Sequence, residues 1–196
     1  MTYSRVAVRH NGAVSTTFPR TRRSRSGYNV DQVEDFLEEA RRAYTADPRD
    51  PTVLAAGGIR TTAFSMQRGG YSPTHVDAAL ERLEDAFASR ERERSFAHTG
   101  DAAWYARARG SAQEILDRLA REPGHKFSRV GPLTTGYSAR DVDAFATRLV
   151  GYFQHGKPMS VETARTVVFA GSKRGYNETQ VDLLLDAVID VMLAVR

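Results

Sequence analysis

The chain has 196 residues, of which 41% are hydrophobic and 27% are charged, and its formal net charge is +4. It contains no cysteine, which excludes a disulfide framework, a thiolate metal site and a thiol nucleophile. No run of about 18 apolar residues occurs, and the first residues lack the apolar stretch of a secretory signal, so we expect a cytoplasmic protein.

Residues 1–17 alternate between polar and apolar side chains around Asn11-Gly12. This dipeptide is typical of tight hairpin turns. An isolated hairpin is only marginally stable in water. The segment is therefore expected to be either hairpin-like or flexible.

From residue 18 onward one pattern occurs four times, centred on a Gly-Tyr dipeptide at positions 27, 70, 136 and 175. The four stretches align without gaps and read SGYNVDQVEDFLEEA, GGYSPTHVDAALERL, TGYSARDVDAFATRL and RGYNETQVDLLLDAV. We call the four repeats that contain these stretches, with the bounds given next, the first to fourth Gly-Tyr segments. Repetition of this kind predicts tandem copies of one structural unit, spanning 18–47, 52–87, 126–154 and 160–196.

Each Gly-Tyr is followed by the start of a predicted helix. The N-cap positions hold residues whose side chains accept from the first turn, namely Asn29, Ser72, Ser138 and Asn177. Pro73 follows at the first helical position, where proline is best tolerated. Gln32 and Gln180 fit a capping box. The glycine is expected to allow a sharp turn or a positive φ before the helix.

The predicted helices carry apolar residues spaced four, three and four apart. These residues are Val33, Leu37, Ala40 and Tyr44; Val76, Leu80, Leu83 and Phe87; Val142, Ala146, Leu149 and Phe153; and Val181, Leu185, Val188 and Met192. Such spacing is typical of helices that pack along a seam, and two heptads are too short to be stable alone. We expect an all-α protein, a helical bundle of short coiled-coil pairs in which segment one packs with two and three with four.

Upstream of each Gly-Tyr lies one phenylalanine. Phe18 and Phe127 precede their glycine by nine residues, whereas Phe64 and Phe169 precede it by six. Between the second and third segments, residues 88–125 form an insertion that includes the amphipathic stretch DAAWYARARGSAQEILDRLARE. This stretch predicts one further helix, ended by Pro123-Gly124.

Catalytic and metal sites find no support in the sequence. The five histidines are scattered without the spacing of metal ligands, and no nucleophile lies near a base in a recognisable pattern. We therefore expect a protein that is not an enzyme and that binds no cofactor or metal.

The repeated pattern F-x(5–8)-GY-[NS]-x-x-x-V-[DE]-x-[FLA] resembles the DivIVA domain, the N-terminal module of the bacterial DivIVA and GpsB cell-division proteins. The chain is similar to the multi-copy DivIVA-repeat proteins of actinobacteria. The resemblance implies a helical scaffold or adaptor at the inner membrane face, near the septum or pole. It implies cell-division or cell-wall synthesis proteins as partners, and it leaves open self-association and peripheral contact with an anionic membrane.

In GpsB-like members, a groove beside the Gly-Tyr binds Arg-containing peptides through the tyrosine and two acids one helical turn apart. The matching positions are Tyr28, Glu34 and Glu38; Tyr71, Asp77 and Glu81; Tyr137 and Asp143, with Thr147 in place of the second acid; and Tyr176, Asp182 and Asp186. Carboxylates at i and i+4 can accept a guanidinium, and a tyrosine ring offers cation–π stacking.

Two other interpretations of these acids stay open. Their negative charge could stabilise the start of the helix by interacting with the helix dipole. Alternatively, the chain's own arginines could occupy them as fixed salt bridges between segments, with Arg25, Arg60, Arg68 and Arg165 as candidates.

In DivIVA proper, an exposed phenylalanine two residues before the glycine inserts into lipid. The equivalent residues here are Arg25, Arg68, Thr134 and Lys173, so an apolar contact would fall to Met66, Val130 or Leu133. Basic residues near a charged surface contribute about 1 kcal/mol each. The candidates for contact with an anionic lipid or partner are Arg20, Arg22, Arg23, Arg25, Arg68, Lys173 and Arg174.

Two alternative functions remain. One is a basic helical protein that binds nucleic acid through the arm from Arg20 to Arg25, and the other is a purely structural oligomerisation module. Against nucleic acid, the third segment has no basic residue just before its glycine, and the 28 basic residues interleave with 24 acidic ones.

Overall fold

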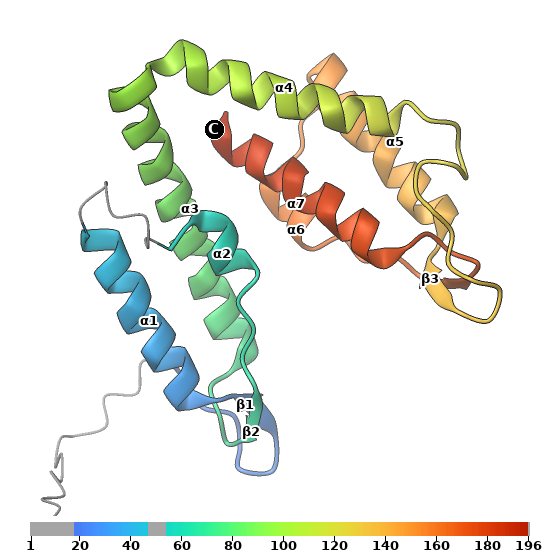
Figure 1. The fold of residues 1–196 in the computed structure, drawn as a ribbon. Helices are drawn as coiled ribbons and strands as arrows, with labels where there is room; N and C mark the ends of the chain where they lie inside the picture. The colour runs from blue at the N-terminus through green and yellow to red at the C-terminus, as the bar shows by residue number, and fades with distance from the viewer. Residues whose placement is uncertain (1–17, 47–53, 196) are drawn as a thin grey trace, which may run out of the picture. The chain divides into compact units, whose positions relative to one another are not determined.

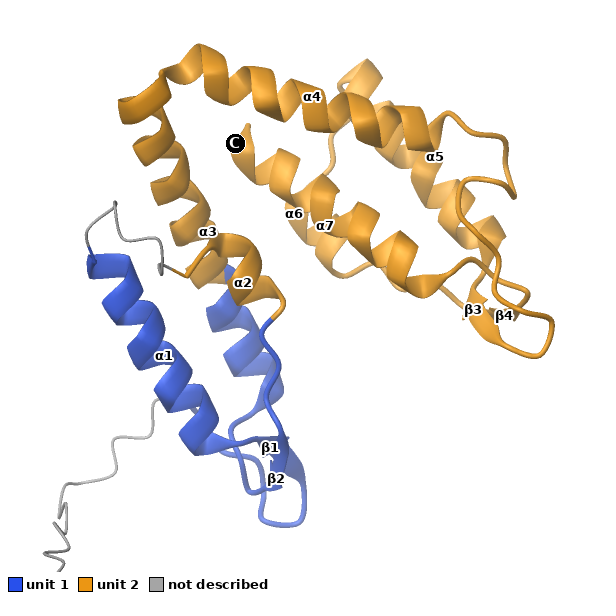
Figure 2. Cartoon of the chain, viewed as in Figure 1, with its two compact units in different colours: residues 1–46, 62–81 blue, residues 47–61, 82–196 orange. Residues whose placement is uncertain are grey.

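The computed structural model describes residues 18–46 and 54–195, and 62% of it is helical (Figure 1). The described residues belong to two compact units (Figure 2). Unit 1 lies within Met1–Ala46 and Thr62–Glu81, and unit 2 lies within Asp47–Thr61 and Arg82–Arg196. The predominantly α fold is confirmed. The hairpin-like or flexible segment predicted for 1–17 lies outside the described residues.

Unit 1 contains β1 (Ser26–Tyr28), α1 (Val30–Thr45), β2 (Met66–Arg68) and the first part of α3 (Pro73–Thr99). β1 pairs antiparallel with β2, and the register places Gly27 opposite Gln67. Its core consists of Val30, Val33, Tyr71 and Val76, with Phe18, Tyr28, Leu37, Phe64 and Leu80 packed against them.

Unit 2 contains α2 (Ala56–Arg60), the rest of α3, α4 (Asp101–Leu119), β3 (Thr135–Tyr137), α5 (Ala139–His155), α6 (Val161–Arg165), β4 (Gly171–Lys173) and α7 (Glu178–Ala194). β3 pairs antiparallel with β4, and the register places Gly136 opposite Ser172. α4 packs against α5 and α7, and α6 packs against α7.

The structure adds two small sheets to the predicted helices. Their strands are three residues long, and each sheet joins two Gly-Tyr segments. The expected pairing of the first segment with the second, and of the third with the fourth, is found in their strand pairs. The strands were not predicted because three residues are too few to show an alternating pattern of apolar and polar side chains. Such a short stretch becomes a strand only by pairing with a segment that is distant in sequence.

The helix of the second segment is longer than predicted. Residue 88 was expected to open an insertion, but α3 continues to Thr99. No glycine or proline interrupts residues 88–99, and the helix ends where Gly100 adopts φ 79°. The further helix predicted within the insertion is α4, which ends before Pro123-Gly124.

The predicted seam is buried or half-buried at nearly every position, and Val33, Val76, Val181 and Val188 are among its most buried side chains. Tyr44 is an exception, because it lies in the last turn of α1 and is 40% exposed. The helices therefore pack along the faces that their spacing predicted.

Close backbone contact, rather than positive φ, explains the glycines of the Gly-Tyr dipeptides. A Cβ on Gly27 would lie within 3.0 Å of the Tyr71 carbonyl oxygen, and one on Gly70 would approach the Tyr28 oxygen equally closely. Gly136 and Gly175 repeat this arrangement with Tyr176 and Tyr137. The expected positive φ falls one residue earlier, at Gly69 (φ 65°) and Arg174 (φ 55°).

Candidate interaction sites

Reciprocal backbone hydrogen bonds join the tyrosines of paired segments. The N–H of Tyr28 donates to the carbonyl of Tyr71 and the reverse bond is also made, both at 2.9 Å. Tyr137 and Tyr176 make the same two bonds at 3.0 and 2.7 Å. Each pair of segments therefore has an approximate two-fold relation at its tyrosines.

The N-cap residues extend this relation. Asn29, Ser138 and Asn177 cap their helices with the side chain, as predicted. Each cap residue also donates its own N–H to the partner segment, at the carbonyl of the residue that follows the partner's phenylalanine. These bonds are Asn29 to Ser65, Ser72 to Pro19, Ser138 to Ala170 and Asn177 to Ser128, at 2.7–2.8 Å.

The predicted capping boxes are not formed. Gln32 accepts from the Ser65 N–H at 2.8 Å, and Gln180 accepts from the Ser128 N–H at 2.9 Å. The N–H groups that these side chains would satisfy in a capping box already bond to the partner segment. The glutamines therefore fix the pairing of segments rather than the start of their own helices.

Each tyrosine ring packs edge-on or tilted against the phenylalanine of the partner segment. The ring centroids are 5.5 Å apart for Phe18–Tyr71 and for Tyr28–Phe64. They are 5.3 Å apart for Phe127–Tyr176 and for Tyr137–Phe169. The single phenylalanine of each segment thus helps to hold the tyrosine of the other.

Each tyrosine hydroxyl bonds to an acid of the partner segment, and not to the acid of its own segment as the groove prediction has it. Tyr71 donates to Glu34 at 2.5 Å, and Tyr176 donates to Asp143 at 3.0 Å. Asp77 lies close enough to Tyr28, and Asp182 to Tyr137, to raise the pKa of the phenol. The two-fold pairing therefore exchanges the acids between segments.

These contacts keep the phenols protonated. Burial raises the pKa of Tyr28 above its ordinary value, and the hydrogen bond that the phenol donates to Asp77 raises it further. Burial raises the pKa of Tyr137 in the same way, with Asp182 adding to it. Both effects favour the protonated form of these two phenols, which can donate a hydrogen bond to the neighbouring acid.

The second acids do not complete two-carboxylate grooves. Glu38 lies 3.8 Å from Arg42 in an exposed i,i+4 pair. Asp186 accepts from Arg60, and Glu81 is half-buried. At the third position, the Thr147 hydroxyl donates to the Asp143 carbonyl. The first acid of each segment is the one that lies beside the tyrosine of the partner segment.

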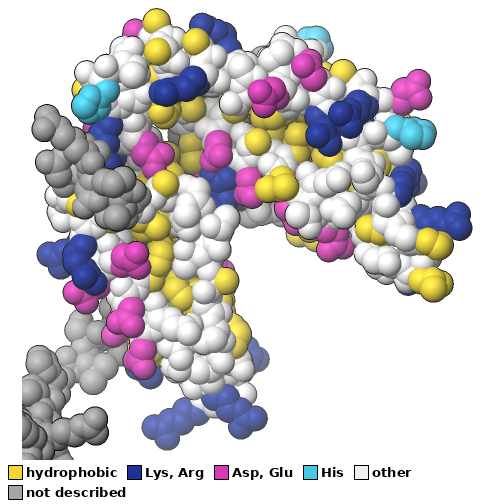
Figure 3. Space-filling view, in the orientation of Figure 1, with side chains coloured by type: hydrophobic (Ala, Val, Ile, Leu, Met, Phe, Trp, Pro, Cys, Tyr) yellow, Lys and Arg dark blue, Asp and Glu magenta, His cyan; other side chains and the backbone are white. Residues whose placement is uncertain are grey.

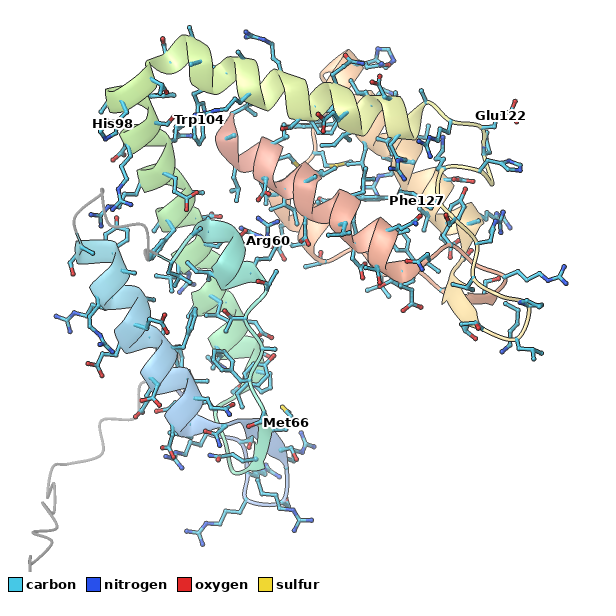
Figure 4. The ribbon with its side chains drawn as sticks, in the orientation of Figure 1. Arg60, Met66, His98, Trp104, Glu122 and Phe127 are labelled. Atoms are coloured by element: carbon cyan, nitrogen blue, oxygen red, sulfur yellow. The ribbon has the colours of Figure 1, made fainter. Side chains whose placement is uncertain are left out.

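The chain's own arginines do form fixed salt bridges between segments, around an acid that the sequence did not single out. Arg60 and Arg165 hold the two oxygens of Glu84, each at 2.7 Å, and the Glu84 side chain is only 3% exposed. Figure 4 shows Arg60 at the end of α2. Of the other candidates, Arg25 and Arg68 are exposed.

The arrangement around Glu84 is reciprocal. Arg60 binds Asp190 at 2.6 Å and Arg165 binds Asp85 at 2.9 Å. Burial opposes the charge of Arg60, but Asp190 and Glu84 raise its pKa above the ordinary value. Asp85 and Asp190 each follow their glycine by fifteen residues, and this shared position was the available sequence signal.

Basic side chains gather at the sheet end of unit 1 (Figure 3). In unit 1 the exposed candidates lie before β1 and on β2, and they are Arg20, Arg22, Arg23, Arg25 and Arg68. In unit 2, Lys173 donates to the Leu133 carbonyl at 2.9 Å, and Arg174 is exposed beside it. Of the apolar candidates, Leu133 is 90% exposed, Met66 is 55% exposed, and Val130 is half-buried.

Unit 2 also has a pocket of about 430 Å³, lined among others by Glu91, Trp104, Arg107 and Asp190. Trp104 donates to the Ala194 carbonyl at 2.9 Å. Burial raises the pKa of Glu91, and a hydrogen bond from the Ala56 N–H counteracts this.

Within residues 18–46 and 54–195, no helix is long and apolar enough to cross a membrane. The same residues hold no group of three or more His, Asp or Glu that could bind a metal ion. Comparison of the chain with protein-family models, with curated proteins and with solved structures finds no match.

Proposed function

We propose that this protein is a non-enzymatic adaptor in bacterial cell division or polar envelope growth. It binds Arg-containing segments of cell-division or cell-wall synthesis proteins, and its basic ends contact the inner membrane face. The observation that carries the proposal is the set of four tyrosine–carboxylate pairs, each held by two Gly-Tyr segments.

The chemistry of these pairs suits an arginine side chain. The tyrosine hydroxyl occupies part of the acceptor capacity of the carboxylate and fixes its position, while the remaining lone pairs can accept from a guanidinium. The flat guanidinium also stacks on aromatic rings. The aromatic and backbone contacts hold the tyrosine and the acid in place. Binding therefore costs little conformational entropy in these side chains.

The four segments support the resemblance to DivIVA-type repeats. In that family the helical module pairs between chains. In this chain the first and second segments, and the third and fourth, make reciprocal bonds with each other. We interpret each pair as a dimer-like module formed within one chain.

A fluorescent fusion in the native host tests the adaptor role. We expect it to concentrate at the septum or pole. A uniform distribution through growth and division would contradict the role.

Flotation with vesicles tests the membrane contact. The chain is expected to float with anionic vesicles at low salt. It should not float with them at high salt, and it should not float with zwitterionic vesicles. Leu133→Asp should weaken flotation, because it places a negative charge beside Lys173. Flotation that is absent, or that does not respond to salt, would remove this part of the proposal.

A further inference from the structure

The four tyrosine–carboxylate pairs differ in the residue that faces the tyrosine backbone. In every case that residue stands two positions after the phenylalanine of the partner segment. It is Arg20 opposite Tyr71, Arg129 opposite Tyr176, Met66 opposite Tyr28 and Gly171 opposite Tyr137.

Two of the tyrosines are covered by the chain's own arginines. The Arg20 guanidinium lies 5.7 Å from the ring centroid of Tyr71, and the Arg129 guanidinium lies 5.0 Å from that of Tyr176. Both tyrosines are 0% exposed. Arg129 is held further by hydrogen bonds to the carbonyls of Gly124 and Arg174.

Among residues 18–46 and 54–195, no arginine lies over the ring of either of the other two tyrosines. Tyr28 and Tyr137 are partly exposed, and their carboxylate partners Asp77 and Asp182 are exposed. Met66 is uncharged and 55% exposed, and Figure 4 shows it projecting from β2. The equivalent Gly171 has no side chain. Neither can supply a cation to the ring beside it.

The spacing of the phenylalanines separates the two classes. Where the phenylalanine precedes its glycine by nine residues, the extra chain after Phe18 or Phe127 forms an isolated bridge to the partner's tyrosine. Where the spacing is six, the chain passes directly into β2 or β4. The tyrosine of the other segment then stays partly exposed to solvent.

We propose that this chain has two binding sites for an arginine side chain of a partner, Tyr28 with Asp77 and Tyr137 with Asp182. The sites at Tyr71 and Tyr176 are filled internally by Arg20 and Arg129. The inference rests on the proposed adaptor function and names its sites. The ligand class follows from the molecule itself, because an arginine already lies over the equivalent tyrosine ring in two of the four cases.

NMR of the full chain labelled with 3-fluorotyrosine tests this inference, with the signals assigned by single Tyr→Phe variants. The probe is N-acetyl-L-arginine amide, and the control is the uncharged N-acetyl-L-citrulline amide. We expect saturable shifts of the Tyr28 and Tyr137 signals with the arginine probe. The Tyr71 and Tyr176 signals should not move, and the citrulline probe should move none of the four.

Two substitutions sharpen the test at Tyr28. Asp77→Asn removes the charge that pairs with the guanidinium and should weaken the response of Tyr28 about tenfold, while Tyr137 responds as before. Met66→Arg places an arginine at the position that Arg20 and Arg129 occupy. It should shift the Tyr28 signal before any probe is added and abolish the response. Met66→Gln is the matched control and should keep the response.

Equal shifts of all four signals, or no shift at Tyr28 and Tyr137, would overturn the inference. So would a Met66→Arg variant that still responds like the unsubstituted chain. If the NMR titration shows no shifts but the fluorescent fusion still localises to the septum or pole, these sites are wrong and the adaptor role stands. If the shifts are as expected but the fusion is uniformly distributed, the sites stand and the adaptor role is wrong.

Discussion

Gly136 has its backbone against the carbonyl of Tyr176, and Gly27 has the same relation to Tyr71. At such a position the side chain is limited by contact with a neighbouring backbone, which cannot move aside as a flexible side chain could. The reciprocal tyrosine bonds depend on that contact, so the missing Cβ is a requirement of segment pairing.

We therefore predict that Gly136→Ala lowers the free energy of unfolding of unit 2 by about 1–3 kcal/mol through overpacking. Gly110→Ala is the control, because a Cβ at this glycine, inside α4, meets nothing within 4 Å. It should raise stability by up to about 1 kcal/mol. Urea unfolding followed by fluorescence of the single tryptophan, Trp104, reports both. A Gly136→Ala variant as stable as the unsubstituted chain would disprove the close-contact explanation.

A second residue-scale prediction concerns Glu91. Burial raises its pKa above the ordinary value of 4.5. The unfolded chain therefore releases this proton at a lower pH than the folded chain, and the contribution of Glu91 to stability falls as pH rises above about 4.5. Glu91→Gln removes this loss, so its stability relative to the unsubstituted chain should improve between pH 4.5 and 7. A difference that does not change with pH would contradict the raised pKa.

At the scale of elements, the Glu84 cluster ties α2 and α6 to α3 and α7 within unit 2. Arg60 and Arg165 stand at equivalent places in their segments, and each reaches an aspartate of the other segment's helix. Glu84 lies between them and has no charged counterpart, because the position equivalent to it in α7 is Ile189. One buried carboxylate therefore forms salt bridges with two guanidinium groups.

Removing that carboxylate leaves two largely buried arginines with fewer acceptors. We predict that Glu84→Gln lowers the free energy of unfolding by about 3 kcal/mol. Glu122→Gln is the matched control on an exposed loop (Figure 4) and should change it by less than about 0.5 kcal/mol. Both are measured by urea unfolding through Trp104. Equal effects of the two substitutions would mean that the cluster is not important for stability.

The helices show what local sequence can predict. N-caps such as Asn29 and Asn177, and seam residues such as Val33 and Val188, depend on neighbours one or two turns away, and they were predicted correctly. The strands, the exchange of acids between segments and the Glu84 cluster depend on residues 24 to 130 positions apart. Periodicity within one segment contains no information about such contacts.

The candidate sites follow the same division. The tyrosines and first acids were identified from one segment's pattern, but their pairing required the fold. The difference between spacings of nine and six was visible in the sequence. Its meaning became clear only when Arg20 and Arg129 were found over the rings of Tyr71 and Tyr176.

At the scale of the whole molecule, the first pair of segments and the second each contain one filled and one open tyrosine–carboxylate pair. A chain with two open sites can hold two arginine-bearing segments, or two copies of one partner, at once. Simultaneous engagement raises the effective affinity for a partner that carries two such segments. This is the behaviour expected of an adaptor at a site where division proteins are concentrated.

Calorimetric titration of the full chain with Arg-bearing cytoplasmic tails of the host's division and cell-wall synthesis proteins tests this account most directly. The chain should bind such a tail, and Asp77→Asn combined with Asp182→Asn should abolish the binding. Glu34→Gln combined with Asp143→Asn changes the two filled sites and should leave it intact. Absence of binding, or equal loss in both double variants, would contradict the account.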